Sequence, residues 1–138
     1  MVPLKPMDID VALLDAHPLT LTAPLACHVN DKGNAFGGSL ASIMTLACWG
    51  LMTATTREHG LDCDVYVGET AVRYLKPVEE NLSINGFFDD ANEVDAFLEQ
   101  LRAKGKARLE MTAQTVLAEG VVAATLTGKF VAFVRKNP

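Results

Sequence analysis

A long uncharged stretch constrains this sequence more than any other feature. No Asp, Glu, Lys or Arg occurs from Gly33 to Thr56, which is long enough for a helix that spans a bilayer. However, Gly, Ser and Thr interrupt the stretch, and its densest apolar part, Leu40–Ala54, is shorter than the roughly 20 apolar residues that a transmembrane helix needs. The sequence therefore predicts a helix from about Gly38 to Glu58 that is apolar nearly all round and is buried in the core of a folded domain.

The segments around this helix carry the alternating pattern of β-strands. One strand is predicted before the helix and four after it: Leu19–Val29, Asp64–Val78, Leu82–Asp89, Ala107–Leu117 and Val121–Val134. The last two form a hairpin, because only a short Ala-Glu-Gly turn separates them. An amphipathic helix, Asn92–Lys104, precedes this hairpin and is capped by Asn92, and a short helix is expected at residues 7–16.

One antiparallel sheet of about five strands, wrapped around one long helix, accommodates this order of elements. We therefore expect a single α+β domain over residues 1–138, with its core at about 18–134. Such a sheet has exposed edges and an uncovered outer face, which a second copy of the chain can cover. The sequence thus predicts a homodimer or a homotetramer.

Composition narrows the class of function. The formal net charge is −5 and the chain has no Lys/Arg cluster longer than two residues, so nucleic acid is a poor candidate partner. The three cysteines are widely spaced, with no CxxC and no Cys/His pair at zinc-ligand spacing, so we expect neither a metal nor another cofactor. Unpaired thiols, and an N-terminal segment without the apolar core of a signal peptide, predict a cytoplasmic protein.

The loop before the long helix carries the most specific motif. Residues 30–38, NDKGNAFGG, resemble the N-x-x-G-x-x-H/F-G-G signature that opens the central helix of hotdog-fold acyl-CoA thioesterases. The later segment Arg73–Val78, RYLKPV, is similar to their Y-x-x-P segment. With the helix sequence, both motifs resemble most closely the thioesterase domain of the YiiD C-terminal type, which is also found fused to the C-terminus of some bacterial GNAT-type acetyltransferases.

This resemblance covers roughly residues 18–134 and implies a hotdog fold. It also implies hydrolysis of an acyl thioester, carried by coenzyme A or by an acyl carrier protein, with water as the acceptor and no metal. In similar proteins the site is shared between two protomers, which agrees with the dimer or tetramer expected from the exposed sheet.

Thioester hydrolysis assigns roles to the residues of the loop. The carbonyl oxygen becomes an oxyanion on attack, and backbone N–H groups at a helix N-terminus can bind it. We expect Gly38 to supply this N–H, and Gly37 to let the substrate approach closely because it has no side chain. Asn30 would position the attacking water or the carbonyl, and Phe36 would pack on the thioester or the pantetheine arm. The remaining candidates for substrate binding are Asp31, Arg73 and Lys76. A tight turn capped by Asn30 is the simpler alternative for this loop.

The catalytic base is harder to assign. In many similar thioesterases a carboxylate stands seven residues after the second glycine, whereas this chain has Thr45 at that position. A threonine without an adjacent base is a weak nucleophile, so we expect Thr45 to hold a water by a hydrogen bond. Glu69 is the candidate base, because a carboxyl group partly buried in a strand has a raised pKa. A solvated carboxylate paired with Arg73 is the alternative for Glu69, and the other nearby acids are Asp31, Asp62 and Asp64.

Two other functions stay open. A non-catalytic module that binds or senses acyl thioesters agrees with the missing carboxylate on the helix. A hotdog dehydratase or hydratase is less favoured, because it needs a His/acid pair at the site. His28 precedes the loop, and His17 and His59 lie outside it.

Overall fold

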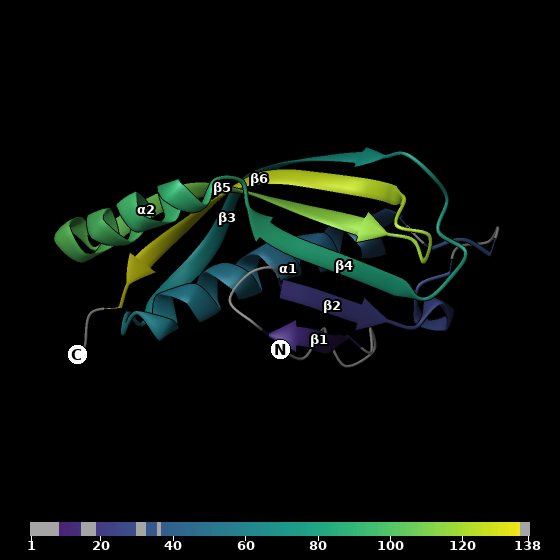
Figure 1. Cartoon of the computed structure of the whole chain (residues 1–138), viewed down its shortest axis with the longest axis horizontal. Helices are drawn as coiled ribbons and strands as arrows, with labels where there is room; N and C mark the ends of the chain where they lie inside the picture. The colour runs from purple at the N-terminus through teal and green to yellow at the C-terminus, as the bar shows by residue number, and fades with distance from the viewer. Residues whose placement is uncertain (1–8, 15–18, 30–32, 36, 136–138) are drawn as a thin grey trace.

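The computed structural model describes residues 9–14, 19–29, 33–35 and 37–135. Its strands form one antiparallel sheet that lies against the long helix α1 (Gly37–Glu58), as Figure 1 shows. The strand order is β1-β2-β4-β5-β6-β3. The strands span Asp10–Leu14 (β1), Leu19–Ala23 (β2), Cys63–Tyr74 (β3), Leu82–Phe88 (β4), Lys106–Val116 (β5) and Val122–Val134 (β6). The five predicted strands, the long helix and the hairpin of β5 and β6 are therefore confirmed as elements, although β3 ends at Tyr74, four residues before the predicted end at Val78.

The N-terminal segment differs from its prediction. We expected a helix at residues 7–16, but Asp10–Leu14 forms the edge strand β1, which pairs with β2. Pairing with an otherwise open sheet edge decides the conformation here, since local helical preference is weak over so few residues. The predicted strand Leu19–Val29 also ends early, at Ala23. Pro24 has no N–H for the ladder and leads into the short 3-10 turn η2 (Leu25–Cys27).

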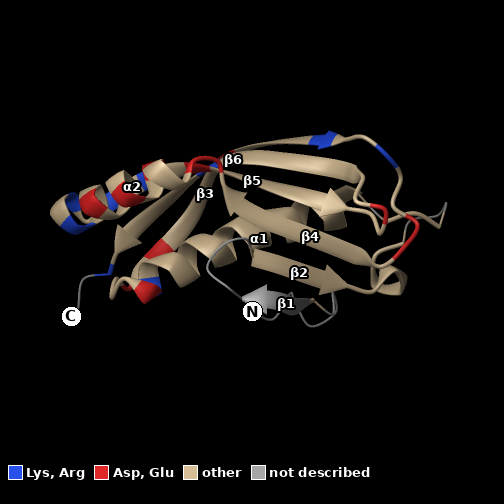
Figure 2. Cartoon of the chain, viewed as in Figure 1, with Lys and Arg blue, Asp and Glu red and all other residues tan. Residues whose placement is uncertain are grey.

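Helix α1 forms the centre of the core. Ten of its 22 residues are buried, and Ile43, Met44 and Leu51 are almost fully enclosed. By length and composition alone α1 could cross a membrane, a test that the core helix of a soluble protein also passes. Its charged residues are confined to its C-terminal end, whereas α2 carries charge along its length (Figure 2). Packing against the sheet accounts for the apolar character of α1.

The second helix, α2 (Ala91–Lys104), precedes the final hairpin as predicted. Its N-cap is Asp90, whose carboxylate accepts a hydrogen bond from the Asn92 N–H at 2.9 Å, so the prediction that Asn92 is the cap was wrong by two residues. Gly105 ends the helix with a φ of 73°, in the left-handed region that favours glycine. The apolar stripe is buried as expected at Phe97, Leu98 and Leu101.

Strand β3 lies at the opposite edge of the sheet from β1 and pairs only with β6 among the described strands. Its register with β6 shifts between Val67 and Glu69, so Gly68 forms a β-bulge. From the bulge to the end of the strand most side chains are exposed. Four of the six large apolar side chains exposed among the described residues lie on this strand or directly after it: Tyr66, Val67, Tyr74 and Leu75.

Candidate active site

The two motifs singled out in the sequence meet at the start of α1. The Ala35 N–H donates a hydrogen bond to the Val78 carbonyl at 2.8 Å, and the Tyr74 hydroxyl donates one to the Gly37 carbonyl, also at 2.8 Å. An isolated antiparallel bridge between Val29 and Ala35 closes the base of the loop. The glycine-rich loop and the RYLKPV segment are therefore parts of one structural unit.

An open groove of about 350 Å³ lies at this junction. One wall comes from Asn34, Ala35, Gly37 and Leu40, and the other from residues 74–78. The groove is mostly apolar, with the Lys76 ammonium, the Tyr74 hydroxyl and the Asn34 amide as its polar side-chain groups. Apolar walls with a few placed polar groups are typical of small-molecule sites.

The first turn of α1 gives this groove a positive end. Gly37 and Gly38 are the first two helical residues, where backbone N–H groups have no acceptor within the helix. No acidic residue lies in that turn, so no carboxylate of the turn itself offsets the dipole. Gly38 is an exposed residue, as a donor to a bound ligand must be. This arrangement can bind an anion or the oxygen of a polarised carbonyl.

The predicted site residues are only partly brought together. Gly37 and Lys76 line the groove, and Gly38 adjoins it. Arg73 is exposed between Val72, which packs on the core, and Tyr74, which contacts Gly37. Because side chains alternate along a strand, Arg73 points to the face of the sheet away from α1. Three further predicted residues lie outside the described part of the chain: Asn30, Asp31 and Phe36.

Thr45 lies about 10 Å along α1 from Gly38, since a helix rises about 1.5 Å per residue. Its hydroxyl donates a hydrogen bond to the Ala41 carbonyl at 2.8 Å, and the side chain is half-buried. The hydroxyl proton is therefore engaged within the helix, which disfavours Thr45 as a nucleophile. Its oxygen lone pairs are still available to accept a hydrogen bond from a water.

Glu69 is not partly buried in the chain, contrary to the reason for which it was chosen. Its side chain is 75% exposed and forms an ion pair with Lys129, with 3.6 Å between Oε2 and Nζ. The expectation of burial was wrong because β3 is an edge strand. The alternative of a solvated carboxylate agrees with this exposure, but the partner of Glu69 is Lys129 on the neighbouring strand and not Arg73. About 17 Å of strand separates Glu69 from Tyr74, so one chain alone does not bring Glu69 to the groove.

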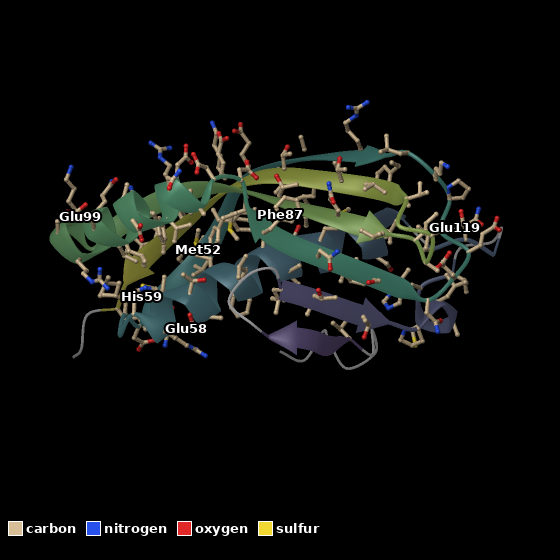
Figure 3. The ribbon with its side chains drawn as sticks, viewed as in Figure 1. Met52, Glu58, His59, Phe87, Glu99 and Glu119 are labelled. Atoms are coloured by element: carbon tan, nitrogen blue, oxygen red, sulfur yellow. The ribbon has the colours of Figure 1, made fainter. Side chains whose placement is uncertain are left out.

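Neither Cys48 nor His59 adds a reactive group to the groove. Burial raises the pKa of the Cys48 thiol to about 12, so this cysteine is a neutral core residue. His59 lies at the C-terminal end of α1, at the opposite end of the molecule from the β5–β6 turn that carries Glu119 (Figure 3). The groove adjoins the Glu119 end, since Leu75 N–H and Lys76 N–H both donate to the Ala123 carbonyl. Among the described residues, no three His, Cys, Asp or Glu side chains gather as a metal site requires.

Tyr74 and Asn34 are groove residues to which the sequence analysis gave no role of their own. Tyr74 stands within the RYLKPV segment, but a sequence motif does not say which atom the tyrosine contacts. The contact with Gly37 depends on the register of β3 against β6 and on the distance between β3 and α1. One sequence signal could have indicated this contact: the tyrosine of the Y-x-x-P segment occurs in the same chain as the glycine pair of the loop motif.

A single antiparallel sheet around a central helix, with two glycines opening that helix, defines a hotdog protein of the thioesterase type. The chain belongs to the putative thioesterase family named after the YiiD C-terminal domain, whose family model matches residues 2–134. Solved structures of the same fold agree with this assignment. A protein of unknown function from Chlorobaculum tepidum has a TM-score of 0.90 and 28% identity, over 98% of this chain and 88% of its own.

Two further structures carry thioesterase descriptions. A putative thioesterase from Shewanella oneidensis has a TM-score of 0.85 and 26% identity, over 96% of this chain and 89% of its own. A Pseudomonas aeruginosa protein, described as of unknown function and a probable thioesterase, has a TM-score of 0.82 over 98% of this chain and 89% of its own. At 17% identity, the last comparison supports the fold alone.

Proposed function

We propose that the protein hydrolyses an acyl thioester of coenzyme A or of an acyl carrier protein, with water as the acceptor. The observation that supports this most directly is the groove of about 350 Å³ at the first turn of α1, where both family motifs meet. A thioester carbonyl seated in the groove would meet the N–H of the exposed residue Gly38, and Lys76 would contact a polar or anionic part of the substrate.

The loop residues complete this mechanism. Asn30 orients the attacking water or the carbonyl, and Asp31 and Phe36 contribute to binding of the substrate beside it. Thr45 accepts a hydrogen bond from the water through its free lone pairs, since its own proton is donated to Ala41. The Val29–Ala35 bridge supports the roles of Asn30 and Asp31, because these two residues lie between the bridged positions in the chain.

A second copy of the chain would supply the base. Glu69 is too far from the groove of its own chain, but it is exposed on an edge strand that a partner can approach. In this proposal, Glu69 of one protomer accepts a proton from the water at the Gly38 end of the partner's α1. For Glu69 to act as the base, the first turn of α1 in the partner must approach β3 on the face of the sheet that carries Glu69 and Lys129. Arg73 lies on the same face as Glu69 and could bind the substrate of the partner's site.

Exposed apolar residues on β3 support the homodimer. Val67 on β3, Tyr74 at its end and Leu75 directly after it are each about half exposed, and an open sheet edge with such side chains is a site for strand pairing. Cytoplasmic localisation is part of the same proposal, and the three free cysteines are consistent with a reducing compartment.

The alternative is a module that binds or senses acyl thioesters without hydrolysing them. It is favoured by two observations: Thr45 stands where a carboxylate is expected, and the exposed Glu69 is paired with Lys129. A free-thiol assay against acyl-CoAs of different chain lengths, combined with calorimetric binding, separates the two functions. Thiol release above the uncatalysed rate supports the hydrolase, whereas binding without release supports the sensing module and contradicts our proposal.

A further inference from the structure

We propose that Tyr74 is a positioning residue whose hydroxyl orients the peptide group that carries the Gly38 N–H. This inference rests on the proposed function, in which that N–H is the oxyanion donor. It adds a residue for which neither the motif nor the fold assigns a role.

Two contacts connect Tyr74 to the first turn of α1. Its hydroxyl donates a hydrogen bond of 2.8 Å to the Gly37 carbonyl. Its ring lies against Gly37, because a Cβ added there would be 3.3 Å from Cζ and 3.4 Å from both Cε1 and the hydroxyl oxygen. Such distances are tighter than an ordinary van der Waals contact between carbon atoms. Glycine at position 37 therefore makes room for the tyrosine as well as for a substrate.

Peptide geometry links this contact to the neighbouring N–H. The carbonyl of Gly37 and the N–H of Gly38 belong to one planar, trans peptide group, in which the two bonds point in opposite directions. A donor that holds the carbonyl in place therefore also sets the direction of the N–H. A hydrogen bond accepted by the carbonyl further polarises the group and strengthens the N–H as a donor.

The backbone holds Tyr74 in position from both sides. Within β3 it pairs with Ala124 of β6, and the N–H groups of Leu75 and Lys76 both donate to the Ala123 carbonyl, at 2.8 and 3.0 Å. Beyond them, the Val78 carbonyl accepts from the Ala35 N–H. Tyr74 thus connects the sheet to the first turn of α1. Tyr74 is 55% exposed, so the hydroxyl contact is not a by-product of core packing.

The test is Tyr74→Phe, which removes the hydroxyl and keeps the ring. We expect kcat for acyl-CoA hydrolysis to fall about tenfold, with KM changed by less than about twofold. The variant retains the Gly38 N–H as a donor to the oxyanion and loses only the hydrogen bond that orients this N–H. Tyr66→Phe is the matched control, since Tyr66 is the other tyrosine of the chain and lies on the same strand. Its ring packs edge-on against Phe133, and the control should retain the parent kcat.

A spectroscopic measurement tests the hydrogen bond independently of turnover. In protein labelled with carbon-13 at the glycine carbonyls, Tyr74→Phe should shift the Gly37 carbonyl resonance and the adjacent Gly38 amide resonance. Tyr66→Phe should leave both unchanged. A Gly37 resonance that is the same in the Tyr74→Phe variant and the parent would show that the contact is absent in solution and would overturn the inference.

A second variant separates orientation from general loosening of the turn. Gly37→Ala forces the Tyr74 ring to move by a few tenths of an ångström and should lower kcat in the parent. In the Tyr74→Phe background the same change should lower kcat by a smaller factor than in the parent, because it then hinders only the approach of the substrate and no longer displaces an orienting hydroxyl. Fully additive losses would contradict a shared cause.

The two proposals fail in different ways. A parent protein that releases no thiol from any acyl-CoA contradicts the proposed function, and this inference with it. An active parent whose Tyr74→Phe variant retains full kcat contradicts this inference alone.

Discussion

Gly86 of β4 lies directly against Ala47 of α1. A Cβ added to Gly86 would be 2.8 Å from the Ala47 carbonyl carbon, 2.9 Å from its oxygen and 3.0 Å from its Cβ. Real Cβ atoms do not approach this closely, so the helix can pack on the centre of the sheet only while residue 86 has no side chain. The closeness of this contact sets the distance between α1 and β4.

Gly86→Ala should therefore destabilise the protein by about 1–3 kcal/mol or more, as overpacking in a rigid core does. Two of the three nearest atoms belong to the helix backbone, and backbone atoms cannot rotate away as a side chain can. Urea denaturation followed by circular dichroism measures the free energy of unfolding. Ser83→Ala, at a half-buried position on the other face of the same strand, should stay within about 0.5 kcal/mol of the parent. Equal stabilities of the two variants would mean that α1 and β4 are further apart in solution.

The fold was predictable where the pattern is local. The uncharged stretch of α1, the alternation of β4 and β5 and the stripe of α2 each reflect burial of one face of one segment. The N-terminal strand was not predictable in this way. Its conformation depends on pairing with β2, which the sequence of Asp10–Leu14 does not encode by itself.

The same distinction holds at the candidate site. The candidates Gly37, Gly38 and Lys76 could be found from the sequence. The two glycines belong to the motif of residues 30–38 and the lysine to the RYLKPV segment, and each motif is recognisable by its residue types alone. The exposure of Glu69 could not, because it follows from the position of β3 at the sheet edge, and strand order is a property of the whole chain. The Tyr74–Gly37 contact likewise needs the register of β3 on β6.

The edge strand leads to a prediction about assembly. Light scattering at micromolar concentration should give two or four times the chain mass of 14.8 kDa. Val67→Lys should shift the protein towards 14.8 kDa and lower the activity, because Val67 is 47% exposed on β3 and a lysine on an edge strand opposes pairing. Glu99→Lys, on the exposed face of α2 (Figure 3), should leave the mass unchanged. A parent that scatters as a single chain at every concentration would contradict the dimer and any site built between protomers.

Asn30 provides a test of the loop itself. Asn30→Ala should reduce thioester turnover by at least about tenfold without changing the fold, because it removes a group that positions the water or the carbonyl. Circular dichroism and the thermal midpoint check the fold, and Asn92→Ala, on exposed α2, is the matched asparagine control. Full activity of Asn30→Ala would mean that the residue only caps a turn.

The assignment of the base makes the most exacting prediction. Glu69→Gln should reduce kcat by about a hundredfold with little change in substrate binding, the usual scale for loss of a general base. Its ion pair with Lys129 is exposed, so the substitution should alter stability by less than about 1 kcal/mol and the loss of rate should not reflect unfolding. Thr45→Ala, which removes only a water ligand, should cost less in rate.

Glu110→Gln is the control for Glu69→Gln. Glu110 is exposed on β5 and stands opposite Lys129 in the register of β5 and β6, so the control removes a carboxylate from the same face of the sheet. It should retain the parent rate if the role of Glu69 is chemical and not a matter of surface charge. Equal losses of kcat in both variants would indicate that the negative charge of this face of the sheet affects the rate, and that Glu69 has no specific chemical role. A fully active Glu69→Gln would transfer the role to Asp31, Asp62 or Asp64, of which Asp62 and Asp64 already pair with Arg135.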